Sequence, residues 1–465
     1  MSGRQSWLTR LGLLAGIDRA VAYTALARAT QIFGSVGTVL LIVRFLTPVG
    51  QGYYYTLLSL VMLQTIFELG FSFVIQQLAA HESIVCRLQP DGGFEGEPVA
   101  YDRLASIAQL TVRWYFRAGL VLVVVLLPLG LVFFSQKVRA EEQIGWLGPW
   151  ITAVLASSLT FLLTPLYSFL EGCNQINQVA RMRLIQSCAV IVASWGAIAS
   201  GHGLYACTCV NIGVVSVGLV FLARRRRLLR ALLKHRAGAN AVSWRVEVWP
   251  FQWKIAVSSL CAYFTAQVFT PILFMSRGPL DAGRMGLSLS IVNYLPVLVL
   301  SWLTTKATPF GQLVKLGQLQ ELDRLFFRTL KQSSSLILLL AAACLGAVIV
   351  AHQMLPGIAL RMESPLVFGL LLLTAIGTFL VQGMAVYLRS FKREPYLVQS
   401  IVVSSLTLLA IALAAPRWGN LGVAITYFVC SGLLGLIWAA AILRRQRAVQ
   451  AVAAGASDGA RAQGV

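Results

Sequence analysis

The segment Ala22–Ala80 reads AYTALARATQIFGSVGTVLLIVRFLTPVGQGYYYTLLSLVMLQTIFELGFSFVIQQLAA. It predicts two long apolar helices joined by a turn at Thr47–Gly52, because Pro and Gly interrupt the hydrophobic run there. Each helix carries polar residues at helical spacing on one face, namely Thr24, Arg28, Gln31, Ser35 and Thr38, and then Gln64, Glu68, Ser72 and Gln76. Lipid cannot solvate such rows. The pair therefore predicts a polar pathway inside a membrane protein.

The composition places the chain among polytopic membrane proteins. Of its 465 residues, 57% are hydrophobic and only 12% are charged, and the mean hydropathy is +0.75. This balance lies well outside that of soluble domains. The expected fold is all-α, with about 12 transmembrane helices. Asp18 and Arg19 interrupt the first apolar run, so we expect the first span to stay as an anchor and not to be a cleaved signal.

Hydropathy predicts twelve spans. They cover residues 22–46, 53–80, 104–134, 147–171, 176–199, 203–223, 251–275, 283–308, 332–355, 365–388, 396–415 and 421–443. Proline within a span predicts a kink that neighbouring helices accommodate.

The distribution of Lys and Arg predicts the orientation. Most of the 38 Lys and Arg fall on segments of one side, and six fall in loops of the other side, namely Lys137, Arg139, Arg277, Arg284, Arg361 and Arg417. The positive-inside rule then places both termini in the cytoplasm. The net charge of +21 needs no nucleic acid as partner, because it is explained by this bias beside an anionic leaflet.

The two halves of the sequence resemble each other. Gly52, Leu58, Ser59 and Val61 align in order with four residues of the second half, Gly283, Leu289, Ser290 and Val292. The expected organisation is a six-helix bundle over 1–223, a basic cytoplasmic linker over 224–250, a second six-helix bundle over 251–443 and a disordered cytoplasmic tail over 444–465. An even number of spans per half makes the repeat parallel. Substrate sites in such proteins lie between bundles near the middle of the membrane.

Five short motifs carry a family resemblance. They are RFLTPVGQGY at 44–53, FELGF at 67–71, LEG at 170–172, GPLDAG at 278–283 and GNLGVA at 419–424. In this order, across residues 20–445, they resemble the polysaccharide-transporter branch, which contains the O-antigen-type flippases, of the multidrug/oligosaccharidyl-lipid/polysaccharide (MOP) exporter superfamily. The sequence departs from the family pattern where Arg389 and Ser390 replace a glycine-bearing turn.

The resemblance implies a function. It implies two six-helix bundles that translocate an undecaprenyl-diphosphate-linked oligosaccharide across the inner membrane, for O-antigen, capsule or exopolysaccharide synthesis. Partners would be the lipid-linked glycan, membrane lipids, a coupling ion such as H⁺ or Na⁺, and other polysaccharide assembly proteins. The alternative within the superfamily is a cation-coupled multidrug exporter. A membrane glycosyltransferase is a further class, but it predicts a long outer loop with catalytic residues, and the predicted outer loops are short.

No enzyme chemistry is expected. The sequence has no phosphate-binding loop with Lys and Ser or Thr, no Ser/His/Asp grouping and no metal-ligand pattern, so we expect no catalytic residue, metal or cofactor. The pair Cys207 and Cys209 has no His or acid in helical register, which favours small buried hydrophobes.

The first polar rows supply the candidate substrate contacts. Arg28, with Gln31 and Ser35, suits a diphosphate or sugar hydroxyls; the structural alternative is a snorkelling or paired arginine. Glu68 is the costliest residue for a membrane interior. It could bind a coupling H⁺ or Na⁺, pair with Arg28, or hold the first two helices together. Gln64 lies one turn before it.

The second half is less charged. Gln267 on the seventh span and Asn293 on the eighth are its candidate cavity residues, since amides suit glycan hydroxyls. The alternative is that such polar rows hold transmembrane helices together.

Overall fold

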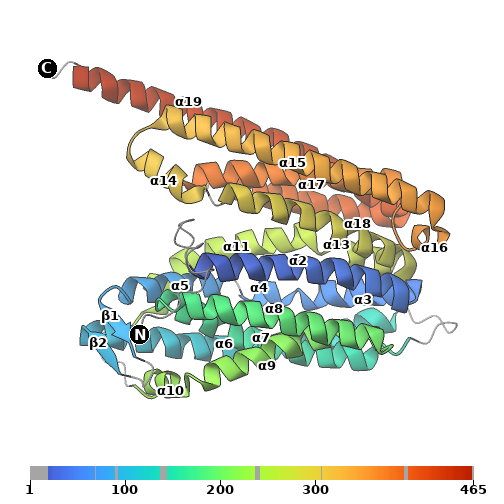
Figure 1. Cartoon of the computed structure of the whole chain (residues 1–465), viewed down its shortest axis with the longest axis horizontal. Coiled ribbons are helices and arrows are strands. Elements are labelled where there is room, and N and C mark those ends of the chain that lie inside the picture. Colours follow the sequence, from blue (N-terminus) through green and yellow to red (C-terminus); the bar gives the residue numbers. More distant parts are fainter. Residues whose placement is uncertain are drawn as a thin grey trace, which may run out of the picture. The chain divides into compact units, whose positions relative to one another are not determined.

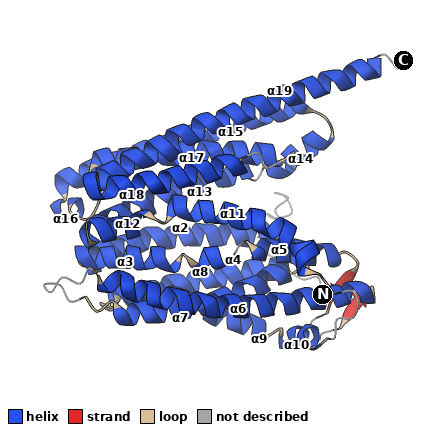
Figure 2. Cartoon of the chain, turned by 180° about the vertical axis from the view of Figure 1, so that it is seen from behind, coloured by secondary structure: helices blue, strands red, loops and turns tan. Residues whose placement is uncertain are grey.

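The computed structural model shows an all-α membrane protein with one small β-sheet (Figures 1 and 2). It describes residues 19–68, 70–89, 93–136, 144–235, 241–304, 306–391 and 396–462. Within these ranges, nine helices are long and apolar enough to cross a membrane, and the bent pair Pro48–Glu68 and Phe71–Glu82 makes ten. The predicted fold class is therefore confirmed.

The chain divides into two compact units, residues 1–263 and 264–465. The first unit contains α2 (Arg19–Phe45), α3 (Pro48–Val61), α4 (Gln64–Glu68), α5 (Phe71–Glu82), β1 (Cys86–Leu88), β2 (Phe94–Gly96), α6 (Pro98–Ser135), α7 (Leu147–Gly172), α8 (Ile176–Ala199), η1 (Gly203–Tyr205), α9 (Ala206–Ala223), α10 (Arg226–Lys234) and η2 (Trp244–Val248). Strands β1 and β2 pair antiparallel. Helix α11 (Trp249–Ala266) begins in the first unit and ends in the second.

Helices α2 and α8 pack side by side in the first unit (Figure 1). Gln31 donates to the Ser187 hydroxyl at 3.2 Å, and the Trp195 indole donates to the Thr38 hydroxyl at 3.0 Å. The sequence separation is 156 residues in the first pair and 157 in the second. Because it stays almost constant along the contact, the two helices run parallel. A Cβ on Gly37 would lie 2.1 Å from the Trp195 ring, so glycine allows the close approach. Parallel packing is what alternating spans require of the first and fifth.

In the second unit, the described residues form helices joined by turns and short loops. Its elements are α12 (Phe269–Ser276), α13 (Pro279–Thr304), α14 (Ala307–Lys315), α15 (Leu319–Met354), α16 (Pro356–Ala359), α17 (Pro365–Arg389), α18 (Leu397–Tyr427), η3 (Phe428–Leu434) and α19 (Gly435–Ala462). A buried cluster at one end includes Phe310, Phe326 and Tyr387. Burial of these rings is the kind of packing that fixes helices against one another.

A turn inside the segment α18 separates the last two spans. Gly419 has φ 58° and ψ −145°, which is not helical. Gln399 donates to the Gly435 carbonyl at 2.6 Å, and the Thr407 and Ser431 hydroxyls lie 3.0 Å apart. The sequence separation of the bonded residues falls from 36 to 24 toward the turn. The helices before and after Gly419 therefore run antiparallel. The predicted spans 396–415 and 421–443 are therefore two helices of a hairpin.

Two predicted spans are interrupted in the structure. The second begins at Pro48, not at residue 53, because Pro48 fits the first turn and Thr47 caps it by accepting from the Gly50 amide at 3.0 Å. It then breaks before Gly70. The seventh divides at Gln267 between α11 and α12. Pro271 lacks the N–H that would bond the Gln267 carbonyl in a continuous helix.

The structure assigns helices to the C-terminal tail and to the basic segment between the two predicted bundles. Helix α19 continues to Ala462, in keeping with the high helix propensity of its alanine-rich end; the disorder expected of the tail 444–465 stays a prediction. The basic segment 224–250 contains α10 and η2. Leu228 and Leu232 of α10 are fully buried, and Gln109 of α6 donates to the His235 carbonyl at 2.6 Å. This segment thus packs on the first unit.

Candidate functional site

The second span bends at the most costly carboxylate of the sequence. Helix α4 ends at Glu68, and Gly70 adopts a left-handed conformation with φ 64° before α5 begins. The two parts meet at 42°. Glycine makes the bend possible because a Cβ is strained at this φ. Backbone groups freed by a broken span need polar partners, which is why such helices line sites in transporters.

The surroundings of Glu68 are polar, and among the residues that the structure describes no ion pair joins Glu68 to a cation. Its side chain is half-buried and lies near enough to Tyr115 of α6 to interact with it electrostatically. The Tyr115 hydroxyl is 3.0 Å from the Ser72 hydroxyl. One helical turn before Glu68, the Gln64 Oε1 is buried and has no hydrogen-bond partner within the described chain. These polar groups form a polar cluster where α4, α5 and α6 meet, and within it the Ser72 and Tyr115 hydroxyls share a hydrogen bond.

Aromatic rings flank this cluster. Trp114 of α6 stacks on Trp244 of η2 with centroids 4.5 Å apart, and Phe71 meets Trp244 edge-on at 5.0 Å. The Trp114 indole N–H is buried and has no partner among the residues that the structure describes. The sequence analysis missed Trp114 and Tyr115, because an aromatic pair on an apolar helix is normally core.

The polar row of α2 is divided between two roles. Gln31 and Thr38 bond to α8, as described above, and Ser35 donates to its own helix at Ile32. Arg28 is exposed, and in the described part of the chain no ion pair joins it to Glu68 or to another acid. The structure therefore does not pair Arg28 with Glu68.

Two candidate residues lie in the second unit. Gln267 is half-buried at the break between α11 and α12. Asn293 is exposed on α13, one turn before Pro296. Their grouping with Gln64 and Glu68 of the first unit stays a prediction, as does the substrate role of all seven candidates.

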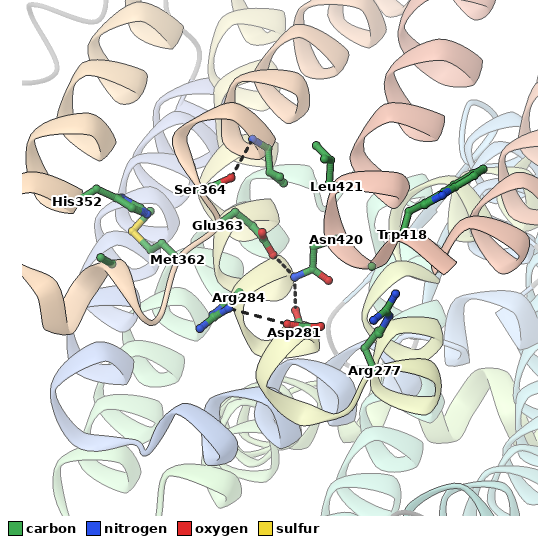
Figure 3. A pocket seen from close by; sticks show the side chains of 13 residues that line it. Arg277, Asp281, Arg284, His352, Met362, Glu363, Ser364, Trp418, Asn420 and Leu421 are labelled. Atoms are coloured by element: carbon green, nitrogen blue, oxygen red, sulfur yellow. Dashed lines mark hydrogen bonds and ion pairs between the residues drawn. The ribbon is translucent and has the colours of Figure 1, made fainter. Parts of the chain in front are cut away.

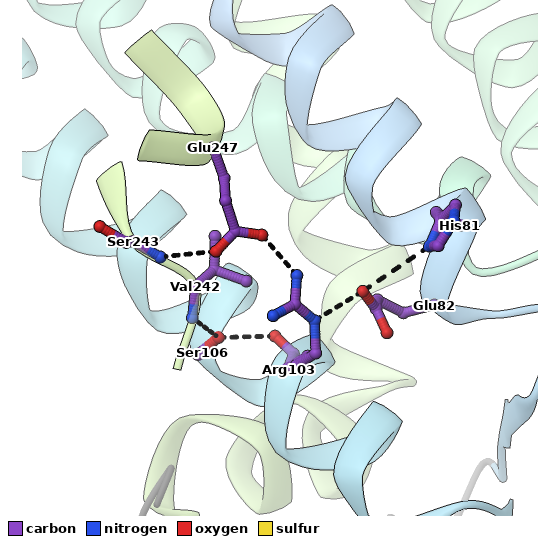
Figure 4. Close-up of polar contacts among 7 residues, drawn as sticks. All are labelled: His81, Glu82, Arg103, Ser106, Val242, Ser243 and Glu247. Atoms are coloured by element: carbon purple, nitrogen blue, oxygen red, sulfur yellow. Dashed lines mark hydrogen bonds and ion pairs between the residues drawn. The ribbon is translucent and has the colours of Figure 1, made fainter. Parts of the chain in front are cut away.

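A network at one end of the first unit fixes η2 to the bundle (Figure 4). Arg103 of α6 donates to Glu82 at 2.7 Å and to Glu247 of η2 at 2.5 Å. The Ser243 amide also donates to Glu247 at 3.0 Å. The Ser243 amide, followed by the Arg103 guanidinium, lowers the pKa of Glu247 below its usual value. Glu247 thus stays ionised at neutral pH and keeps the ion pair.

A cavity of about 500 Å³ lies within the second unit, where α13, α17 and the Gly419 turn meet (Figure 3). Glu363 forms its floor; the side chain is 4% exposed and accepts a hydrogen bond from Asn420. Burial raises the pKa of Glu363 to about 8. The motif at 419–424 pointed to this turn, whereas Glu363 stands in no motif and was missed.

Comparison with solved structures shows the fold. The chain matches a MOP superfamily transporter from Pyrococcus furiosus with a TM-score of 0.53 and 12% identity, over 92% of this chain and 95% of that one. It matches the lipid II flippase MurJ with a TM-score of 0.54 and 13% identity, over 91% of this chain and 87% of that one. It matches an inward-facing multidrug resistance MATE transporter with a TM-score of 0.52 and 14% identity, over 91% and 95%.

The three matches share one fold, and this chain has it. No model of a protein family matches the chain, and no curated protein does. At 12 to 14% identity the similarity concerns the fold alone.

Proposed function

We propose that the chain is a flippase that translocates a lipid-linked oligosaccharide, carried on undecaprenyl diphosphate, across the inner membrane by alternating access. The fold supports a transporter, since the matched structures are transporters and one is a lipid II flippase. Fold alone does not choose between an anionic and a cationic cargo. The choice rests on the charges of the first unit.

The proposal rests on the position and the charge of Arg28. It is exposed, lies about 13 Å along α2 at ~1.5 Å per residue, and has no carboxylate partner in the described chain. A cation within a membrane span needs water or an anion to solvate it. A diphosphate passing along α2 would supply that anion, with charge-assisted hydrogen bonds from the guanidinium.

The test is transport by purified protein in proteoliposomes. A fluorescent undecaprenyl-diphosphate oligosaccharide is incorporated, and its change of leaflet is followed by quenching from outside. Arg28→Ala should slow transport by about tenfold or more, because a hydrogen bond to a charged group contributes roughly 1.5–3 kcal/mol. Arg44→Ala is the matched control, since it removes an exposed cation from the other end of the same helix; its rate should stay within about twofold of wild type. Undiminished transport by Arg28→Ala would remove the basis of the proposal.

The second candidate function is a cation-coupled multidrug exporter. It is favoured by Glu68, a half-buried acid at a bend without a cationic partner among the described residues. The same proteoliposomes distinguish the two, because an exporter would move a cationic dye against Na⁺ or H⁺ and leave the glycolipid in place. In the flippase, Glu68→Gln should abolish stimulation of transport by an ion gradient if Glu68 binds the coupling ion. Full transport by Glu68→Gln at every pH would exclude that role.

A further inference from the structure

The cavity of the second unit is lined by charges of both signs that do not cancel. Arg284 is paired with Asp281, with Nη1 and Oδ1 4.0 Å apart. Arg277 donates from Nε to the Ala415 carbonyl at 3.1 Å and from Nη2 to the Arg417 carbonyl at 2.8 Å. In the described chain Arg277 has no carboxylate partner. Because Arg277 is also exposed, its positive charge is accessible to an anion that enters the cavity.

The floor of the cavity offers hydrogen-bond acceptors as well. The Asn420 amide nitrogen donates to Glu363 and, at 3.1 Å, to the Asp281 carbonyl, which fixes the orientation of the amide. Its Oδ1 is then a buried acceptor with no donor in the part of the chain that the structure describes. A buried orphan acceptor costs about 1–3 kcal/mol unless a ligand or water donates to it. Because the pKa of Glu363 is raised to about 8, that carboxyl carries a proton at neutral pH and can donate.

Figure 3 shows how these groups are arranged. Arg277 and Trp418 lie on one side of the cavity and His352 on the other, with Glu363 and Asn420 between them. Trp418 is 67% exposed at the rim, where an aromatic ring can contact the apolar face of a sugar. A ligand that satisfies all these groups needs an anionic group for Arg277 and several hydroxyls that both donate and accept.

We propose that this cavity binds a saccharide unit that carries a carboxylate or a phosphate. The choice of a saccharide among hydroxylated anions rests on the proposed flippase function. The volume of about 500 Å³ is within the range of small-molecule sites, and it accommodates a short oligosaccharide. The cavity would thus select glycans with an acidic residue.

Calorimetric titration of the full chain in detergent tests the proposal. Trigalacturonic acid is the probe, and galactotriose is its neutral match. We expect the acidic sugar to bind at least about tenfold more tightly, as one charge-assisted contact predicts. Arg277→Gln should reduce this preference to about twofold or less. Arg417→Gln is the matched control, because it removes a cation from the same turn that does not line the cavity; it should keep the preference.

A second variant is needed because Arg277→Gln also removes the hydrogen bonds from Arg277 to two carbonyls of the turn. Trp418→Ala removes an exposed ring and should weaken both sugars about equally. Equal affinities of wild type for the two sugars, or an unchanged preference in Arg277→Gln, would overturn the proposal. Displacement of trigalacturonate by phosphatidylglycerol nanodiscs would assign the cavity to lipid head groups and also overturn it. Sugar binding without glycolipid transport would leave this site standing while the proposed function fails.

Discussion

Glu363 shows what one buried carboxyl implies at the scale of a residue. Burial is the main cause of its raised pKa; Asp281 raises it further, whereas the hydrogen bond from Asn420 and the charge of Arg284 oppose the shift. The folded state therefore holds a proton that an unfolded chain, with a pKa of about 4.3, releases. The bound proton contributes fully to the free energy of unfolding below a pH of about 4.3. This contribution is lost as the pH rises toward 8, at about 1.4 kcal/mol per pH unit.

Glu363→Gln should remove this dependence. The variant keeps an oxygen for Asn420 and cannot ionise, so its midpoint of thermal unfolding in detergent should fall less between pH 6 and pH 9 than that of wild type. Glu321→Gln, at an exposed position of α15 in the same unit, should behave like wild type. An identical loss of stability in Glu363→Gln and wild type would show that Glu363 does not hold the proton.

At the scale of elements, the sequence predicts where an apolar span lies better than it predicts whether the helix of that span is continuous. Hydropathy located the helices on both sides of Gly419 and the acidic position at Glu68, because both depend on composition. It did not locate the break at Gly70, since nothing in the polar spacing of Gln64 and Ser72 reports a left-handed φ. The sequence also does not predict which helix contacts the polar row of α2. Spacing placed Gln31 and Thr38 on one face, but only the packing of α8 shows which helix that face contacts.

The bend in the second span gives a prediction at this scale. Gly70→Ala should destabilise the protein by roughly 1–2 kcal/mol, because a Cβ is strained at φ 64°. Gly196→Ala in α8 is the matched control, since its added Cβ would meet no atom within 4 Å; it should be neutral or stabilising by about 0.4–1 kcal/mol. Thermal unfolding of both variants measures the difference. Equal stabilities would indicate that the bend does not need a left-handed residue.

At the scale of the whole molecule, the positive-inside rule assigns the loops of each unit to one of the two sides of the membrane. The strands β1 and β2 and helix α10, with its arginines, belong to the end that the positive-inside rule assigns to the cytoplasm. The Gly419 turn and Glu363 belong to loops assigned to the outside. This predicted orientation matters for the proposals, because with it the cavity proposed for an acidic sugar would lie on the side where the proposed flippase releases its glycan.

Cysteine labelling in intact cells tests this orientation. In a variant whose eight native cysteines are replaced by serine, Trp418→Cys should react with a membrane-impermeant maleimide added outside, because residue 418 is exposed at the turn. Arg87→Cys, exposed on β1, should react only after the membrane is permeabilised. The two positions control for each other, since both are accessible in the folded protein. Labelling of Arg87→Cys alone in intact cells would invert the orientation, and the cavity with Glu363 would then face arriving substrate in the cytoplasm.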